Sequence, residues 1–335
     1  MSLPFVCPSC RSPLESRKEA FRCPACGRGY PVLFGIPDLR IKGDRYLDLE
    51  ADRARAQELD RAAREGASFD DLLELYWRNT PGTPPAIAAR HVAGVRRSVE
   101  ESRPILGALS GGRLLDAGCG SGGALLAAAR SGRFRGLYGV DTALRWLVIA
   151  RARLAEAGLA ERVTLAAAAA EALPFPEGAF DSILLRHLLE HVPNPPKVLE
   201  ACARALAAGG LAGIETFHRW APTPEPHVGL LGATWLPRRL QALYVRWRRG
   251  DDYSAVRLLS RREIVRAVER AGLTIGRFVR APTTPGQREA LPRLLRPLAP
   301  VHDLLGSSPR LNRIVLSRVG PVLRLVARKG SPRPA

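Results

Sequence analysis

The sequence predicts an α/β protein in which a doubly wound, mostly parallel sheet of seven strands follows a small cysteine-rich module. Apolar runs typical of buried strands alternate with helical stretches over residues 106–335, the pattern of a parallel sheet with crossover helices. A glycine-rich turn at 116–122 follows the first strand, where such sheets bind ligands. Four of the six cysteines lie in two Cys-x-x-Cys pairs near the N-terminus. We therefore expect a cysteine module at 1–42, a helical linker at 43–105 and a sheet domain at 106–335.

The composition is that of a globular protein. The 335-residue chain is 46% hydrophobic and has no apolar run of about 18 residues, so neither disorder nor a membrane span is expected. No charged-then-apolar leader opens the sequence, and the paired cysteines favour metal binding in a reducing compartment over disulfides. These features predict a cytoplasmic protein.

The formal net charge of +19 is concentrated in the last third of the chain. Residues 219–335 carry 23 Lys and Arg against 7 Asp and Glu. A field of this sign favours anionic partners: nucleic acid, an anionic membrane surface or a phosphorylated substrate. The alternative is an arginine-rich composition that serves no partner, and the abundance of Ala and Pro beside a single Met fits it.

The two cysteine pairs, with twelve residues between them, predict a zinc ribbon. Each pair lets two thiolates and the amides of a turn surround one ion, and two pairs complete a tetrahedral site for Zn²⁺. Because four protein ligands leave no open position for a substrate, we expect the zinc to be structural. A redox role is the weaker alternative, since it does not need the second pair. The expected ligands are Cys7, Cys10, Cys23 and Cys26.

Residues 43–105 predict helices, because apolar residues recur near helical spacing. The stretch 79–85, rich in proline, breaks the run. A further helix is expected at about 87–102.

The turn after the first strand of the sheet reads Asp-Ala-Gly-Cys-Gly-Ser-Gly. Its alternating glycines accept positive φ angles and let the backbone approach a ligand closely. Asp116 stands where dinucleotide-binding folds direct amides at a pyrophosphate, and a carboxylate there repels phosphate. A second acid, Asp141, ends the next strand about 20 residues further on, where a carboxylate can accept hydrogen bonds from ribose hydroxyls. The two acids predict a nucleoside ligand that lacks phosphate and carries positive charge.

These motifs resemble those of class I S-adenosylmethionine-dependent methyltransferases. Residues 110–215 resemble the ubiquinone-biosynthesis-like group, which shares Ala-Glu-x-Leu-Pro-Phe at 170–175 and Leu-Glu-His-Val-Pro at 189–193. The resemblance implies a Rossmann-like, seven-stranded methyltransferase sheet and S-adenosyl-L-methionine as cofactor. It implies that Asp141 binds the ribose and that Asp116 lies near the methionine end. The implied cofactor-binding residues are Asp116, Gly118, Cys119, Gly120, Gly122, Asp141, Thr142, Ala170, Glu171 and Arg186.

The resemblance has further implications outside the glycine turn. The ribbon resembles small zinc proteins that bind and activate methyltransferases, and such ribbons also occur fused to bacterial methyltransferases. The helices at 43–105 are expected to lie across the cofactor pocket as a lid. Tyr76 and Trp77 then become candidates for substrate contact, with plain packing as the alternative.

One position departs from the resembled group. That group accepts the adenine amino group with an aspartate at the position of Ala169. We therefore expect backbone amides around Ala170 and Glu171, together with apolar packing, to hold adenine. The missing hydrogen bond is worth on the order of 1 kcal/mol, which weakens cofactor affinity several-fold without excluding binding.

Two histidines follow the fourth strand, where ligands of open α/β sheets bind. His187 and His191 are candidates for the general base that removes a proton from a hydroxyl acceptor. A structural or cofactor-side role is the alternative, because Leu-Glu-His-Val-Pro recurs across the resembled group. The spacing places both on one face if a helix begins here, but Pro193 cuts that helix short and a metal site is not expected.

The remaining strands are expected at 209–216, 272–275 and 321–329, the last antiparallel, with a helix at 254–271 before the sixth strand. Two basic insertions, at about 217–252 and 281–320, exceed the minimal fold. Both lie where the resembled fold builds its substrate specificity.

The first insertion predicts a basic amphipathic helix. Leu236, Leu240, Tyr244 and Trp247 share one helical stripe, and arginines take the rest of the helix. This pattern fits peripheral contact with the inner face of an anionic membrane, and ordinary docking on the domain is the alternative. His218 and His227, in the same insertion, are further candidates for a base.

The expected function is transfer of a methyl group from S-adenosyl-L-methionine to a small-molecule or lipid-linked acceptor. The first alternative is an RNA base methyltransferase that uses the ribbon to bind RNA. It is less favoured, because the ribbon is only mildly basic and no Asn-Pro-Pro-Tyr-type motif follows the fourth strand. The second is a non-catalytic cofactor-binding module, against which the intact glycines and both acids argue. The sequence predicts no oligomeric state.

Overall fold

The computed structural model describes residues 3–80, 85–279, 282–283, 288, 291 and 293–330. Its main sheet has seven strands in the order β10-β11-β9-β8-β5-β6-β7. The strands β5 to β9 are parallel to one another, and β11 is antiparallel to both β9 and β10. The expected α/β class and seven-stranded sheet are confirmed. The strands are β5 (Gly112–Ala117), β6 (Phe134–Asp141), β7 (Val163–Ala167), β8 (Phe180–Arg186), β9 (Leu206–Phe217), β10 (Leu273–Phe278) and β11 (Val322–Lys329).

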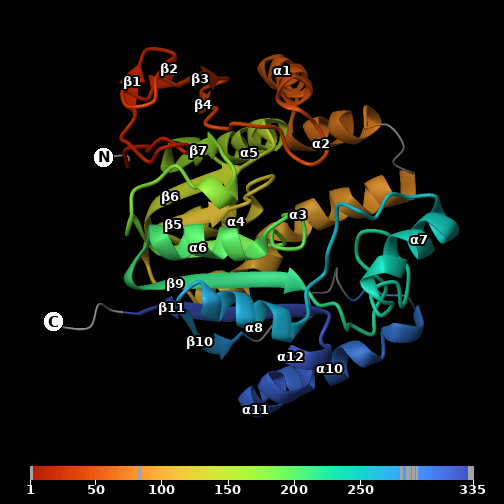
Figure 1. Ribbon diagram of the computed structural model, residues 1–335. Coiled ribbons are helices and arrows are strands. Elements are labelled where there is room, and N and C mark those ends of the chain that lie inside the picture. Colours follow the sequence, from red (N-terminus) through yellow and green to blue (C-terminus); the bar gives the residue numbers. More distant parts are fainter. Residues whose placement is uncertain are drawn as a thin grey trace.

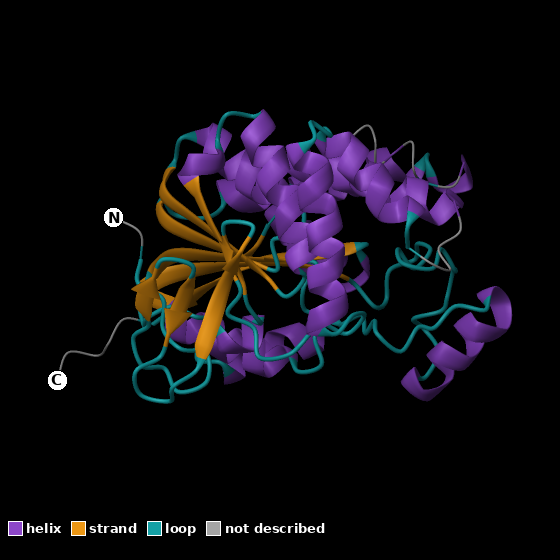
Figure 2. Cartoon of the chain, turned by 90° about the horizontal axis from the view of Figure 1, so that it is seen from above, coloured by secondary structure: helices purple, strands orange, loops and turns teal. Residues whose placement is uncertain are grey.

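Helices cover both faces of this sheet, as Figure 2 shows. The two faces belong to two apolar clusters, because successive strand residues point to opposite sides. Leu115 of β5 packs in the cluster that includes α6 (Pro195–Ala205) and α8 (Arg261–Arg270). Its neighbour Leu114 packs with α4 (Gly123–Ser131) and α5 (Leu144–Glu156). The parallel strands therefore read as nearly continuous apolar runs in the sequence.

The cysteine module folds into a separate four-stranded sheet that lies beside β7 (Figure 1). Its strands are β1 (Glu15–Arg17), β2 (Ala20–Arg22), β3 (Gly29–Leu33) and β4 (Ile36–Pro37). The segment that leaves the module pairs with the edge of the main sheet, since the Leu39 amide donates to the Ala167 carbonyl at 2.8 Å. Phe5 and Tyr30 join the same apolar cluster as Leu115. The module is thus packed into the core of the larger domain.

Three helices connect the module to the sheet: α1 (Leu49–Arg64), α2 (Phe69–Arg78) and α3 (Pro85–Gly107). Asp48 caps α1 by accepting from the Ala51 amide, and Ser68 with Asp71 forms a capping box on α2. The helix expected at 87–102 is longer than predicted at both ends. Pro85 is tolerated in its first turn, where no amide donor is needed.

Other boundaries also differ from the sequence-based expectation. The helix expected from residue 254 begins at Arg261, because Ser260 and Glu263 form a capping box that fixes its start. Leu259, just before this helix, is not helical: it forms a parallel bridge with His218, which directly follows the end of β9. The strands β9 and β10 are longer than the expected ranges of 209–216 and 272–275.

The first basic insertion contains α7 (Arg238–Arg249). Leu236 lies before this helix, so the predicted stripe is wrong in this member. Tyr244 is half-buried, and its ring centre lies 6.3 Å from that of Trp247 on the same helix. The exposed apolar face consists of Leu240, Leu243 and Trp247. The buried face instead carries Val245, because the helix docks on Val228, Leu230 and Ala233 of its own insertion.

The second basic insertion lies partly outside the described residues. Its described elements are η3 (Arg293–Leu295), α10 (Leu298–Ser307), α11 (Pro309–Leu311), η4 (Asn312–Leu316) and α12 (Ser317–Val319). The short turns η1 (Ala160–Arg162) and η2 (Ala170–Ala172) flank β7. Within the described part of the chain, no helix combines the length and apolarity that crossing a bilayer requires.

Candidate active site and cysteine cluster

The glycine turn between β5 and α4 adopts left-handed backbone angles. The φ angles of Gly118, Gly120 and Gly122 are 78°, 49° and 71°. The Gly118 amide donates to the Val140 carbonyl of β6 at 2.8 Å. A Cβ atom on Gly118 would lie 2.8 Å from Leu188, whereas one on Gly120 would meet no atom within 4 Å. The turn is fixed against β6 and has open space beside Gly120.

Asp116 is a buried acid with an unsatisfied oxygen. Its Oδ1 atom is buried and has no hydrogen-bond partner among the described residues. Burial raises the pKa of Asp116 to about 7, with Arg186 opposing and Asp141 reinforcing the shift. A buried acceptor without a donor is costly, and a ligand ammonium group would supply that donor. Asp116 therefore fits the methionine end of the expected cofactor.

Asp141 joins the glycine turn to the loop after β6. Its Oδ2 atom accepts from the Gly120 amide and its Oδ1 atom from the Ala143 amide, both at 2.9 Å. Each carboxylate oxygen has a second lone pair, which leaves capacity for two ribose hydroxyls. The Thr142 carbonyl between them accepts from Arg40 at 2.7 Å. The residues present thus fit a ribose at this position.

Arg40 connects the cysteine module to this loop, and sequence reasoning missed it. Its guanidinium is buried between Asp38, at 2.7 Å, and Asp52 of α1. Asp52 in turn accepts from the Leu144 amide at 2.9 Å and pairs with Arg145 at 2.5 Å. No local pattern marks these residues, because the partners lie up to 102 positions apart in the chain.

The adenine side of the expected pocket is formed by the turn after β7. The Ala168 amide donates to the Asp141 carbonyl at 2.9 Å, which holds this turn beside the ribose position. Ala170 is buried and Glu171 half-buried in η2. Ala169 supplies no side-chain acceptor, so the departure from the resembled group stands.

The thiol of Cys119 does not face this pocket. Cys119 is buried, and a Cβ atom on Gly139 of β6 would lie 2.9 Å from its sulfur. The side chain therefore fills the space against the sheet. Only the backbone of Cys119 remains for the expected cofactor contact.

Arg186 ends β8 inside a buried ion-pair network. Its Nε atom donates to Glu215 at 2.8 Å, and its Nη1 atom donates to the Ser98 carbonyl of α3 at 3.3 Å. Arg324 of β11 pairs with the other oxygen of Glu215. Arg186 also acts on the charge of Asp116. The guanidinium thus anchors the strand end beside the glycine turn.

His187 lies in a turn and not in a helix, which corrects the idea of a shared helical face with His191. Its φ angle of 50° is left-handed, and α6 begins only after Pro193. Its ring nitrogens lie 3.4 Å from Glu190 and 3.0 Å from Glu215. Burial acts to lower the pKa of His187, but the two carboxylates outweigh it and raise that pKa. Because both ring nitrogens face carboxylate oxygens, which accept hydrogen bonds only, the geometry favours the doubly protonated form of His187.

His191 contacts a second histidine from the first basic insertion. Its Nε2 atom lies 3.2 Å from Nε2 of His227, whose Nδ1 atom lies 2.5 Å from Glu225. Burial lowers the pKa of His191 to about 4, so its ring is neutral. The Nδ1 atom of His191 is buried without a partner among the described residues. His227 was a sequence candidate, whereas Glu225 was missed because nothing local marks it. His218, the other candidate, lies elsewhere, where its Nε2 atom accepts from the Arg261 amide at 3.3 Å.

Aromatic side chains from three helices gather next to this cluster. Tyr76 and Trp77 of α2 pack on Trp146 of α5, with ring centres 4.5 and 6.4 Å apart. Trp77 also stacks on His91 of α3 at 5.0 Å. The two residues predicted as lid candidates are thus brought together with two that were missed.

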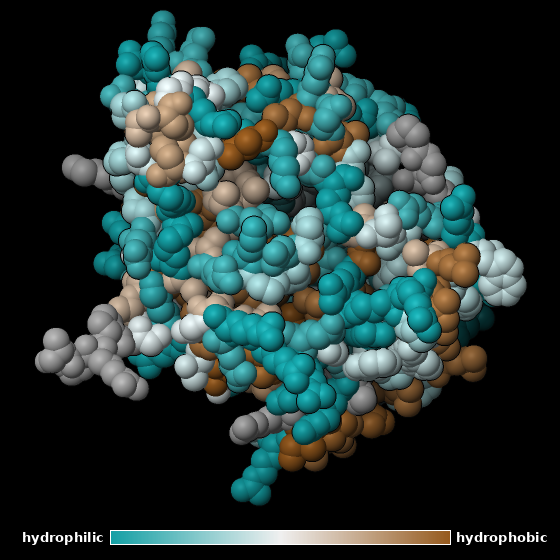
Figure 3. Space-filling view, viewed as in Figure 1, coloured by the Kyte–Doolittle hydropathy of each residue, from teal (hydrophilic) through white to brown (hydrophobic). Residues whose placement is uncertain are grey.

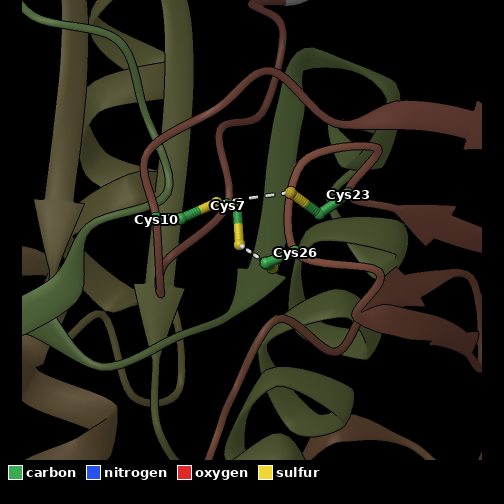
Figure 4. A group of neighbouring side chains, drawn as sticks. All are labelled: Cys7, Cys10, Cys23 and Cys26. Atoms are coloured by element: carbon green, nitrogen blue, oxygen red, sulfur yellow. Dashed lines mark hydrogen bonds between the residues drawn. The ribbon is translucent and has the colours of Figure 1, made fainter.

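The four paired cysteines converge on one point (Figure 4). Their sulfur atoms all lie within 4.8 Å of one another, with Cys7 and Cys26 at 3.7 Å and Cys10 and Cys23 at 3.4 Å. Sulfurs of a tetrahedral zinc site, with Zn–S bonds of about 2.3 Å, lie about 3.8 Å apart. The geometry of this cluster therefore fits Zn²⁺.

Comparison with known proteins places this site in a family. A family model described as "Methyltransferase domain" matches residues 115–214. The ubiquinone biosynthesis O-methyltransferase of Thiobacillus denitrificans is 31% identical over 212 residues, which cover 63% of this chain and 83% of that protein. The chain belongs to the class I S-adenosylmethionine-dependent methyltransferases.

Further relatives of this methyltransferase vary in coverage. The enzyme of the same name from Paracidovorax citrulli is 37% identical over 165 residues, 46% of this chain and 62% of that protein. The solved structure of phosphoethanolamine N-methyltransferase 2 from Haemonchus contortus with S-adenosyl-L-methionine is 20% identical. The structural match covers 79% of this chain and 60% of the chain of that enzyme, with a TM-score of 0.48.

The cofactor of this methyltransferase family, S-adenosyl-L-methionine, supplies an electrophilic methyl group when bound. The acidic and imidazole side chains described above lie at the carboxyl ends of β5, β6, β8 and β9, the edge where open α/β sheets bind their ligands. Carboxylates and imidazoles are gathered there from segments far apart in the chain. This arrangement is suited to direct displacement onto a nucleophile that must lose a proton.

Proposed function

We propose that this methyltransferase transfers the methyl group to a hydroxyl oxygen of a small or lipid-linked acceptor. The observation that carries this is the similarity to a ubiquinone biosynthesis O-methyltransferase across 83% of that protein. The imidazole of His191 beyond β8 supports it, because a hydroxyl acceptor must lose its proton during transfer and this ring has a buried nitrogen without a partner among the described residues.

The proposed cofactor site is the turn and two loops described above. Asp116 receives the ammonium group, Asp141 the ribose hydroxyls, and the backbone around Ala170 and Glu171 the adenine. The amides of the glycine turn and Thr142 complete the enclosure. Arg186 acts through its position beside Asp116, since its own donors are directed at Glu215 and Ser98.

The proposed catalytic groups are the two predicted histidines, in different roles. His187, held as a cation by Glu190 and Glu215, adds positive charge near the reacting oxygen. His191, neutral and with a free ring nitrogen, takes part in proton removal. The helices α1 to α3 form the lid, with Tyr76 and Trp77 on its inner side.

The four cysteines are proposed to hold a structural Zn²⁺. Their spacing and their separation support it, and no fifth group of the required type belongs to the cluster within the described residues. The metal would fix the fold of the module and through it the position of Arg40.

The basic third of the chain is proposed to contact an anionic inner membrane face peripherally. Both insertions leave the sheet at the carboxyl ends of the strands, the edge where the acceptor is expected to bind. Apolar atoms gather over α10 and α11 and over α7 (Figure 3). The exposed apolar side chains of α7 and α10 are Leu240, Leu243, Trp247, Leu298, Val301 and Leu304. Exposed arginines flank them: Arg239, Arg246, Arg248 and Arg249 on α7, and Arg293, Arg296 and Arg310 around α10. Apolar residues rimmed by arginine are typical of interfacial membrane contact.

The deciding experiment incubates purified protein with methyl-labelled cofactor and separate small-molecule, lipid and RNA fractions. Label is expected in an organic-soluble product whose new methyl group is an ether. Label in RNA alone, or a methylated amine as the product, would contradict the proposed acceptor class.

A further inference from the structure

The structure places a chain of three side chains, Glu225, His227 and His191, in contact from two separate segments. Glu225 and His227 belong to the first basic insertion, and His191 follows β8. His227 lies near His187, because Phe217 stacks on the ring of His187 at 4.2 Å and packs against His227 at 5.7 Å. Leu188, in the same turn as His187 and His191, packs over Gly118 of the glycine turn. The chain therefore ends next to the methyl-donor side of the cofactor site.

The protons in this chain follow from its geometry. The carboxylate of Glu225 only accepts hydrogen bonds, because its pKa is lowered, burial being outweighed by donors that include His227. The Nδ1 atom of His227, at 2.5 Å, therefore carries a hydrogen. The tautomer of His227 with its single hydrogen on Nδ1 has a lone pair on Nε2, and in that tautomer the 3.2 Å contact makes Nε2 of His191 the donor. His191 keeps a lone pair on Nδ1, the buried atom without a partner among the described residues.

Resting on the proposed function, we propose that Glu225, His227 and His191 form a proton relay that serves as the general base of the methyl transfer. The acceptor hydroxyl donates its hydrogen bond to Nδ1 of His191. As its oxygen bonds to the methyl carbon, the electron pair of the carbon–sulfur bond stays on sulfur. The hydroxyl proton moves to Nδ1 of His191, and the proton on Nε2 of His191 moves to Nε2 of His227. The positive charge ends on His227, paired with Glu225.

The relay explains why a single histidine would be insufficient. A buried His191 whose pKa lies at about 4 cannot hold a proton near neutral pH by itself. Passing the charge to His227 places it against a carboxylate, where a cation is stabilised. Glu225 is further held by the amides of His227 and Val228, both at 2.7 Å, so its orientation is fixed before substrate binds. Other ionisable groups facing the chain are Glu190, His187, His91, Arg90 and Tyr253.

The first test compares acceptors that need a base with one that does not. The probes are phenol and a nitrophenol that is already ionised at the assay pH. His227→Asn is expected to reduce kcat for phenol about 100-fold or more, the range of general base catalysis, with little loss for the nitrophenol. Glu225→Gln should give a smaller loss of the same pattern. His302→Asn, which alters a similar pair with Asp303 on α10, is the matched control and should change neither rate.

Binding of S-adenosylhomocysteine to the same variants separates the relay from the cofactor site and should stay within about two-fold. An equal loss for both phenols, or no loss for phenol, would overturn the relay. If the wild-type protein methylates neither phenol, nitrogen NMR of the histidine rings still decides. The relay requires a hydrogen on Nε2 of His191 and on Nδ1 of His227, and a hydrogen on Nδ1 of His191 at neutral pH contradicts it.

Discussion

At the scale of single residues, the burial of Asp116 affects both the stability of the fold and the binding of a cationic ligand group. Its pKa of about 7 lies above the ordinary value of a carboxyl, because burial disfavours the ionised form. Between about pH 4 and 7 the folded protein therefore holds a proton that the unfolded chain releases. This group stabilises the fold at low pH, and the contribution is lost as the pH rises through about 7. A ligand ammonium group needs the ionised carboxylate, so ligand binding works in the opposite direction.

We accordingly expect S-adenosylhomocysteine to bind more tightly as the pH rises from 6 to 8, with a proton released on binding at pH 6. Asp116→Asn should remove this pH dependence and weaken binding about 10-fold or more, since a hydrogen bond to a charged group is lost. Titration calorimetry in two buffers with different ionisation enthalpies measures both effects. Asp70→Asn, at an exposed acid paired with Arg96, is the control. A pH dependence that persists in Asp116→Asn would assign the proton to another group.

At the scale of elements, the cysteine module and the loop after β6 behave as one unit. The module contacts the turn after β7 through the Val6 amide and the Pro174 carbonyl at 3.0 Å. Arg11 donates to the carbonyls of Leu173 and Phe175, both at 2.5 Å. Arg40 completes the connection at Thr142. The two loops expected to hold adenine and ribose are thus both fastened to the module.

Arg40→Lys is therefore expected to weaken S-adenosylhomocysteine binding as well as stability, because lysine cannot reach Asp38, Asp52 and the Thr142 carbonyl together. Breaking a buried ion pair costs about 3–5 kcal/mol of stability when one partner is removed entirely, and lysine should cost less. Arg53→Lys is the matched control, since Arg53 also pairs with Asp38 but its side chain is 38% exposed. Thermal unfolding and calorimetry should show both losses only for Arg40→Lys. A loss of stability with unchanged affinity would make Arg40 a purely structural residue.

Local sequence patterns predicted most of the sheet and part of the site. The glycine turn and the strand-end acids are local, because backbone angles and strand polarity are set by neighbouring residues. Arg40 and Glu225 could not be found in this way, because tertiary packing brings Arg40 to Asp52 and Thr142. It also brings His227, the local partner of Glu225, to His191. The sequence left open whether a helix begins at His187, because hydrophobic periodicity does not reveal a residue with a left-handed backbone angle. The exposed face of α7 was partly misjudged because the helix docks on its own insertion through Val245.

At the scale of the whole molecule, the excess positive charge belongs to the last third of the chain, and two insertions in that third expose apolar side chains. We expect the protein to sediment with vesicles of phosphatidylglycerol and to remain in solution with vesicles of phosphatidylcholine, with binding that weakens as salt is raised.

Trp247→Glu should reduce sedimentation several-fold, because it places a charge in the apolar face of α7 at a residue that is 75% exposed. Ala208→Glu makes the same change in charge at an exposed position near the start of β9, at the opposite end of the strand from the insertion, and should leave sedimentation unchanged. Equal losses for the two variants would mean that net charge alone accounts for the effect. Equal sedimentation with phosphatidylcholine vesicles would mean that the arginines do not contribute to membrane binding. A selective loss for Trp247→Glu would place the carboxyl edge of the sheet, and with it the acceptor side of the site, against the lipid surface.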